Sequence, residues 1–128
     1  MLMPDKLNNG ILTRRKVLGD KHVDKALEQT TSFDEPFQNL ITESAWGTVW
    51  KNEAISLRER SMITLALLAA TGNFDEIPMH VRATANTGAS KDDIREAFMH
   101  VAIYAGVPKA NHAFKIAKKV FEDMDNME

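Results

Sequence analysis

Apolar residues recur along most of the chain at the three- and four-residue spacing that one face of an α-helix requires. No segment of useful length alternates with the two-residue period of a β-strand, and no internal repeat is present. The links between the helical patterns are short, so we expect an all-α domain of antiparallel or orthogonal helix pairs. The expected helices cover residues 11–18, 22–29, 32–49, 56–71, 77–87, 91–105 and 108–121.

Small residues mark several of the expected helix ends. Ser90 stands where its side chain can cap the helix that follows it. Gly72, Gly88 and Gly106 each follow a helical pattern, and glycine readily adopts the left-handed conformation that ends a helix. Pro108 opens the last pattern at a position where a missing N–H costs little. These signals separate the second half of the chain into four helices.

Two of the expected helices carry more apolar surface than one buried face needs. Residues 62–70, MITLALLAA, are apolar on nearly every side, and residues 97–105 have an extra apolar face. A helix of this kind is either buried all round or covered by a partner subunit. We therefore expect a homo-oligomer as well as a packed core.

Size and composition narrow the class of protein. The 128 residues fit one domain, which we place at residues 11–124 after a loose arm at 1–10. The net charge of −2 argues against general attraction to nucleic acid or a membrane surface. The longest apolar run is too short for a membrane span, and the first residues lack a signal-peptide pattern. We expect a cytoplasmic protein without nucleic-acid or membrane partners.

The first candidate for chemistry is the pair formed by Glu76 and His80. The two residues are four apart, so on a helix their side chains share one face. A carboxylate beside an imidazole fixes its tautomer and raises its pKa, which suits an acid or a base working near neutral pH. The same spacing also suits a surface ion pair, or an acidic first turn that complements the helix dipole. Spacing alone leaves both interpretations open.

A second group of charges lies in the turn that follows Ser56. Glu59 has the spacing of a capping box with this serine, which is a sufficient structural role. Arg58 can bind an anion together with free backbone N–H groups, or can simply be a solvated surface charge. Arg82 lies two residues after His80, about 200° further round a helix, so it faces another direction.

Glu96, His100 and Tyr104 follow one another at four-residue steps and form one stripe on their helix. Apolar neighbours surround His100 and Tyr104. We therefore expect both side chains in the core, with the polar atoms of the imidazole and the tyrosine hydroxyl hydrogen-bonded. A role in a binding site is the alternative. Trp46 and Trp50 are also four apart and are expected on a side stripe of their helix.

The sequence lacks the motifs of several common sites. There is no cysteine, which removes disulfides, thiolate nucleophiles and thiolate metal ligands. The four histidines share no metal-binding spacing, and no glycine-rich phosphate loop or nucleophile elbow is present. We expect neither a metal nor a cofactor.

Several stretches together resemble the carboxymuconolactone decarboxylase family. They are LRERS at 57–61, EIPMHVRA at 76–83, YAGVPKAN at 104–111 and AWGTVW at 45–50, within a likeness that covers roughly residues 11–124. The resemblance implies an all-helical, AhpD-like orthogonal bundle that assembles as a homo-oligomer, a hexamer or a trimer. The peroxidase branch of that superfamily carries two cysteines where this chain has Asn73 and Glu76. Without them dithiol peroxidase chemistry is excluded, and the retained His80 supports the decarboxylase branch.

The resemblance implies cofactor-free decarboxylation of 4-carboxymuconolactone, a small anionic lactone, in the catabolism of protocatechuate and other aromatic compounds. Alternatives are a cysteine-free relative acting on another lactone or small acid, and a non-catalytic helical assembly module. The chain departs from the family in one segment that concerns substrate binding. The family has a pattern similar to WxRPGL where this chain has WKNEAI at 50–55. If the missing arginine binds a substrate carboxylate in relatives, Lys51 would have to substitute for it. The expected catalytic residues are His80, Glu76 and Glu59, and the expected substrate-binding residues are Arg58, Arg82, Tyr104 and Trp46.

Overall fold

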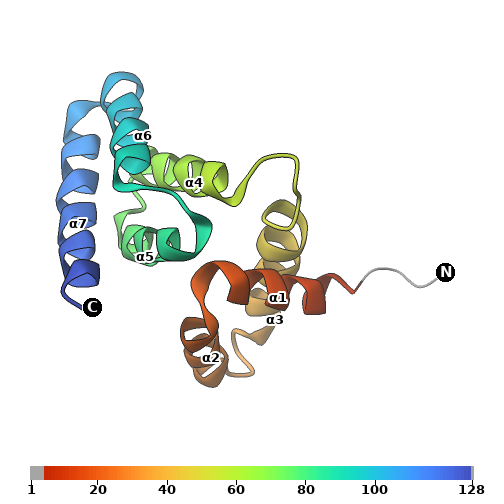
Figure 1. Ribbon diagram of the computed structural model, residues 1–128. Helices are drawn as coiled ribbons and strands as arrows, with labels where there is room; N and C mark the ends of the chain where they lie inside the picture. The colour runs from red at the N-terminus through yellow and green to blue at the C-terminus, as the bar shows by residue number, and fades with distance from the viewer. Residues whose placement is uncertain (1–4, 128) are drawn as a thin grey trace. The chain divides into compact units, whose positions relative to one another are not determined.

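The computed structural model describes residues 5–127, which are helical with short connections (Figure 1). No strand occurs among these residues, so the all-α class expected from the periodicity is confirmed. The described residues divide into two compact units, the first ending at Ser56 and the second beginning at Leu57. A single domain over residues 11–124 stays a prediction. None of the described helices is both long and apolar enough to cross a membrane.

The first helix of the first unit begins earlier than the sequence pattern indicated. Asp5 caps the first helix, because its carboxylate accepts hydrogen bonds from the backbone N–H and the side-chain amide of Asn8, at 3.0 and 2.7 Å. Residues 6–10 are therefore helical, and the expectation of a loose arm is wrong for them; residues 1–4 lie outside the described part. The helices of this unit are α1 (Lys6–Leu18), α2 (Asp20–Gln29), α3 (Glu35–Ile41) and η1 (Thr42–Val49).

Two glycines allow α1 and η1 to pack closely. A Cβ atom added at Gly10 would overlap the carbonyl group of Thr42, and one added at Gly47 would lie 2.5 Å from the carbonyl oxygen of Lys6. Both neighbours are backbone atoms, which cannot rotate away as a side chain can. The absence of a side chain at these two positions therefore sets how near the two helices approach.

Gly10→Ala is expected to lower the free energy of unfolding by about 1–3 kcal/mol, because the added methyl group forces α1 away from η1. The sign is informative, since glycine to alanine inside a helix otherwise stabilises it. Urea denaturation measures the change. Lys16→Ala, an exposed position on the same helix, is the control and should change little. A more stable Gly10→Ala protein would contradict the close packing.

The segment η1 is a π-helix, in which hydrogen bonds span five residues. The N–H of Trp50 donates to the carbonyl of Ala45 at 2.8 Å. The sequence pattern predicted one helix over residues 32–49, and the wider turn of its second part changes which side chains share a face. Trp46 and Trp50 are buried and stacked, with ring centroids 5.2 Å apart. Three large apolar side chains of α3 and η1 are more than half exposed: Phe37, Leu40 and Val49.

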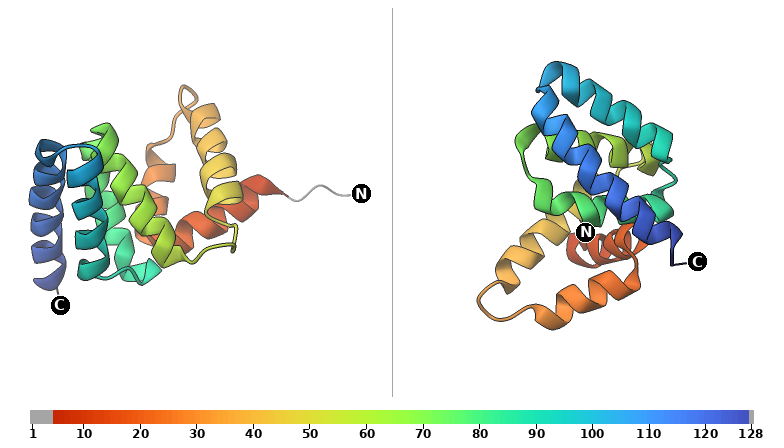
Figure 2. Two further views of the ribbon diagram at one scale, coloured as in Figure 1. Left: turned by 90° about the horizontal axis from the view of Figure 1, so that it is seen from above. Right: turned by 90° about the vertical axis from the view of Figure 1, so that its left-hand side faces the viewer.

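The second unit contains α4 (Leu57–Thr71), the short 3₁₀ helix η2 (Phe74–Glu76), α5 (Ile77–Thr87), α6 (Lys91–Tyr104) and α7 (Val107–Asp125). Both views of Figure 2 show α6 and α7 side by side, as an antiparallel pair joined by a short turn. Glycines end helices as expected, with φ of 78° at Gly72, 84° at Gly88 and 118° at Gly106. The buried core comprises Leu65, Ala69, Ile77, Val81, Ala89, Ile94, Phe98, Val101, Ala110, Ala113, Ala117 and Val120.

Within this single chain α4 is not buried on all sides. Leu65 and Ala69 are fully buried, whereas Ile63 and Leu67 are more than half exposed. On α6, Ile103 is likewise exposed. The apolar surface that the sequence places on these helices thus exceeds what the chain itself covers, and the homo-oligomer stays a prediction.

Candidate functional site

His80 lies on the buried face of α5, near the start of the helix. Gly72 ends α4, η2 reverses the chain, and Pro78 occupies the first turn of α5, where its missing N–H is tolerated. His80 then follows the buried Ile77 by three residues, so both belong to the stripe that faces the core. Only 7% of His80 is exposed, and its Nδ1 atom is buried.

Glu76 occupies a different environment from His80. It ends η2 and is the N-cap residue of α5, and its side chain is exposed. Its carboxylate forms no hydrogen bond or ion pair with any residue in the described range. An acid at the first turn of a helix complements the helix dipole, which is one of the two roles that the spacing left open. The catalytic pair of Glu76 and His80 stays a prediction.

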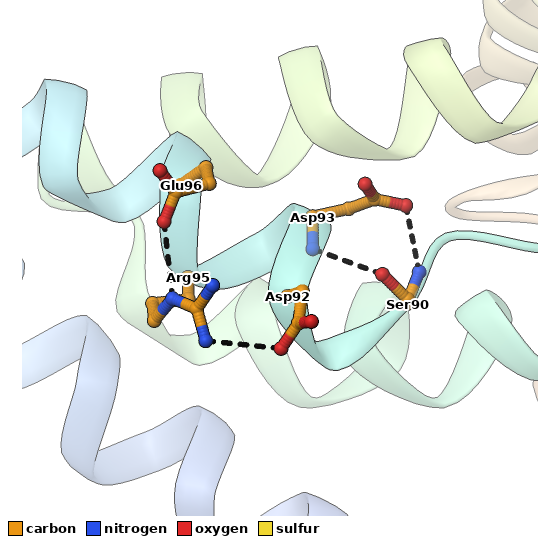
Figure 3. A network of polar contacts seen from close by, with 5 residues as sticks. All are labelled: Ser90, Asp92, Asp93, Arg95 and Glu96. Atoms are coloured by element: carbon orange, nitrogen blue, oxygen red, sulfur yellow. Dashed lines mark hydrogen bonds and ion pairs between the residues drawn. The ribbon is translucent and has the colours of Figure 1, made fainter.

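Arg58 is held by a carboxylate that the sequence pattern did not reveal. Its Nε and Nη2 atoms donate to the two carboxylate oxygens of Asp93, at 2.7 and 2.6 Å. Asp93 also forms the capping box of α6, because its backbone N–H donates to the Ser90 hydroxyl and its carboxylate accepts from the Ser90 N–H (Figure 3). The expected cap at Ser90 is confirmed. A substrate carboxylate would therefore either share the guanidinium of Arg58 with Asp93 or accept a hydrogen bond from the remaining Nη1 atom of Arg58.

The two groups of this pair shift each other's ionisation. The Arg58 guanidinium, with a backbone hydrogen bond from Ser90, holds the pKa of the Asp93 carboxyl well below its usual range. The hydrogen bonds to Asp93 raise the pKa of Arg58 above its ordinary value. Arg58 is half exposed, so solvent screens the pair. The arrangement fixes a cation where the first turn of α4 meets that of α6.

Asp93→Asn is expected to lower the free energy of unfolding near neutral pH, and its difference from the wild type is expected to shrink in acid. The ionised carboxylate stabilises the fold above the unfolded pKa of about 3.9, because the folded pKa is lower. This contribution is lost as the pH falls through the lowered folded pKa. Urea denaturation of both proteins between neutral pH and about pH 3 measures the difference.

Asp92→Asn provides the control for this prediction. It removes the same charge from the same turn of α6, but leaves the capping box and the bond to Arg58 intact. Its loss of stability at neutral pH should be the smaller of the two. Equal losses of unfolding free energy in the two variants would mean that Asp93 stabilises the fold only as a negative charge in the first turn of α6, and not through its bonds to Arg58 and Ser90.

Tyr104 is 85% exposed, so the expectation of a buried tyrosine is wrong. His100 is also exposed rather than in the core, and its ring stacks on that of Tyr104 with centroids 6.2 Å apart. The reason is the position of the core face, which passes through Ile94, Phe98 and Val101. The stripe at four-residue steps from Glu96 lies on another side of α6.

The remaining expected site residues occupy several elements. Arg82 is exposed on α5, on a different side from His80, as its spacing predicts. Glu59 is exposed in the first turn of α4, next to Arg58. Trp46 is buried in the first unit, whereas the other expected site residues belong to the second. The assignment of these residues to catalysis or substrate binding stays a prediction.

The chemistry available on α5 is that of an imidazole. A neutral imidazole can both accept and donate a proton, and burial places it where competing water is limited. Within the described residues no three histidine, aspartate or glutamate side chains gather closely enough to hold a metal ion. His80 is therefore the best candidate for a proton donor or acceptor in the second unit.

The sequence of this chain is similar to those of known decarboxylases over most of its length. Residues 35–119 match the model of the carboxymuconolactone decarboxylase family. The chain is 41% identical over 119 residues to a 4-carboxymuconolactone decarboxylase of Acinetobacter baylyi, covering 93% of this chain and 89% of that protein. It is 39% identical over 117 residues to a nitrosuccinic acid decarboxylase of Metarhizium robertsii, covering 91% of this chain and 82% of that protein.

Proposed function

Since this chain belongs to the carboxymuconolactone decarboxylase family and is a carboxy-lyase, we propose that its substrate is 4-carboxymuconolactone. The observation that carries the proposal is the 41% identity, over nearly the whole chain, to a protein with that activity. The product would be the enol-lactone of 3-oxoadipate, formed during the breakdown of aromatic compounds. The absence of cysteine agrees with this lyase chemistry and excludes a dithiol peroxidase.

The substrate itself can accept the electrons released by decarboxylation. When the bond to the leaving carboxylate breaks, its electron pair moves through the ring C=C onto the lactone carbonyl oxygen. A proton then adds to the ring carbon to give the enol-lactone. Because the conjugated lactone is the electron sink, the reaction needs no pyridoxal or thiamine group. The protein has to bind the anion, stabilise the dienolate oxygen and supply the proton.

We assign the central role to His80 as hydrogen-bond donor to the dienolate oxygen or as general acid. Its burial supports this assignment, because a donor in a water-poor site stabilises developing charge more strongly. Glu76 would set the imidazole tautomer, and would have to turn inward from its exposed N-cap position when substrate binds. Glu59 would be an additional proton carrier.

Substrate binding is assigned to cations and aromatic rings. Arg58 is the first candidate for a substrate carboxylate, because Asp93 holds its guanidinium in place while one nitrogen remains available. Arg82 is the second candidate for this carboxylate, and Tyr104 is the candidate in the second unit for contact with the lactone ring. The exposed apolar side chains of α4 and α6 support assembly as a homo-oligomer, a trimer or hexamer.

A second substrate class is supported by the relative that decarboxylates nitrosuccinic acid. Nitrosuccinate is also a small carboxylic acid with its own electron sink, because a nitro group takes up the electron pair as a nitronate. The KNEAI segment at 51–55 lacks the usual arginine, for which the neighbouring Lys51 would have to substitute, and this difference favours considering another small acid as substrate.

A direct comparison of the two acids tests the proposal. Purified protein, without added metal or cofactor, is given 4-carboxymuconolactone or nitrosuccinate, and CO₂ release is measured for each. We expect kcat/KM to favour the lactone by at least about a hundredfold, since a site shaped for one acid leaves polar groups unpaired with the other. A preference for nitrosuccinate would replace the substrate, and no turnover of either would reject both.

A further inference from the structure

A cavity of about 350 Å³ lies between α6 and α7 in the second unit. Its volume falls within the range of small-molecule binding sites, about 300–1,000 Å³. All of its lining residues come from these two helices, and none of them is an expected site residue of the decarboxylase. The cavity therefore has no role in the chemistry proposed for His80.

The interior of the cavity is aromatic. Phe98, which is fully buried, meets Phe114 edge to face, with ring centroids 5.4 Å apart at 82°. Phe121 adds a third ring, and the small side chain of Ala117 leaves space between the helices. Aromatic side chains in such arrangements offer edges and faces to a planar ring.

The rim of the cavity is cationic, with four basic side chains and one carboxylate. Asp92 and Glu96 hold Arg95 at 2.9 and 3.0 Å (Figure 3). Lys91 pairs with Asp125 at 2.7 Å and lies 5.6 Å from the centre of the Phe121 ring. These contacts restrain two of the cations but leave the other two available.

Lys115 and Lys118 are the available cations. They are three residues apart on α7, so they lie on one side of the helix at the cavity. Both are exposed, and neither forms an ion pair with another described residue. The net charge of the chain is −2, so this positive rim does not follow from a generally basic surface.

From the aromatic interior and the cationic rim we propose that this cavity binds a small aromatic carboxylate, at a site separate from the proposed active site. The ring would enter among the phenylalanines, and the carboxylate would remain at the rim with Lys115 and Lys118. A second copy of the chain fits less well, because a two-fold contact through this rim would bring like charges together. The inference goes beyond the decarboxylase function and does not depend on its substrate.

Binding of 2-naphthoate to the full chain, measured by isothermal titration calorimetry, tests the proposal. We expect Lys115→Gln/Lys118→Gln to raise the Kd at least about tenfold, because two charge contacts are lost. Ala117→Leu, which fills the cavity, is expected to raise it by about the same factor. The neutral 2-naphthylmethanol should also bind at least about tenfold more weakly than the acid. Lys119→Gln is the matched control on α7, outside the cavity, and should stay within about twofold.

Several results would overturn the proposal. They are the absence of 2-naphthoate binding, equal binding of the acid and the alcohol, and unchanged binding by the double lysine variant. Circular dichroism confirms that each variant is folded, and the double variant alters only exposed side chains. A change of oligomeric state in the double lysine variant or in Ala117→Leu, measured by sedimentation without ligand, would mean that the cavity is an interface between copies instead. Undiminished competitive inhibition of the decarboxylase by 2-naphthoate in the double variant would place binding in the active site.

Discussion

His80→Gln is expected to lower kcat for decarboxylation by about 10²–10⁴-fold, the usual loss when a general acid is removed. Glutamine keeps a hydrogen-bonding group near the same place but cannot transfer a proton at neutral pH. The expectation depends on the buried position of His80 on the inner face of α5. If the imidazole acts mainly in the transition state, KM should change much less than kcat.

The measurement is steady-state kinetics with 4-carboxymuconolactone, or with whichever acid the wild type decarboxylates. His112→Gln is the matched control, because that histidine is exposed on α7 and has no assigned role in the site. It should retain nearly full activity. Denaturation curves distinguish a chemical loss from unfolding of the variant. Wild-type kcat in a folded His80→Gln protein would remove His80 from the mechanism.

Phe98→Ala is expected to lower the free energy of unfolding by about 3–5 kcal/mol. Phe98 is fully buried, and its ring meets that of Phe114 edge to face. Alanine removes this contact and enlarges the adjoining cavity between α6 and α7, so the surrounding side chains lose dispersion contacts. A loss of this size is a large part of the stability of an ordinary domain, about 5–15 kcal/mol in total.

Urea denaturation followed by circular dichroism measures the effect. Phe33→Ala is the control, because Phe33 is 93% exposed and its removal should change stability by no more than about 0.5 kcal/mol. A change below about 1 kcal/mol for Phe98→Ala would mean that the second unit closes over the vacated space, contrary to the usual partial relaxation.

The local features of the second unit were predictable because each depends on neighbouring residues. Gly72, Gly88 and Gly106 have positive φ, as expected of residues that end helices. The reciprocal hydrogen bonds of Ser90 and Asp93 also form within one turn. The early start of α1 was missed because its signal is a single polar cap at Asp5, ahead of any apolar periodicity.

The helical class and most helix ends in the second unit could be predicted from the amino-acid sequence alone. Membership of the decarboxylase family could be predicted in the same way, from LRERS, EIPMHVRA and YAGVPKAN. Three features appear only once the helices are packed: Asp93 holds Arg58, Tyr104 is exposed, and three phenylalanines line a cavity beneath a cationic rim. Periodicity and capping act over a few residues, which a single segment can encode. A bond across 35 residues, or the choice of which side of α6 faces the core, depends on how separate helices pack.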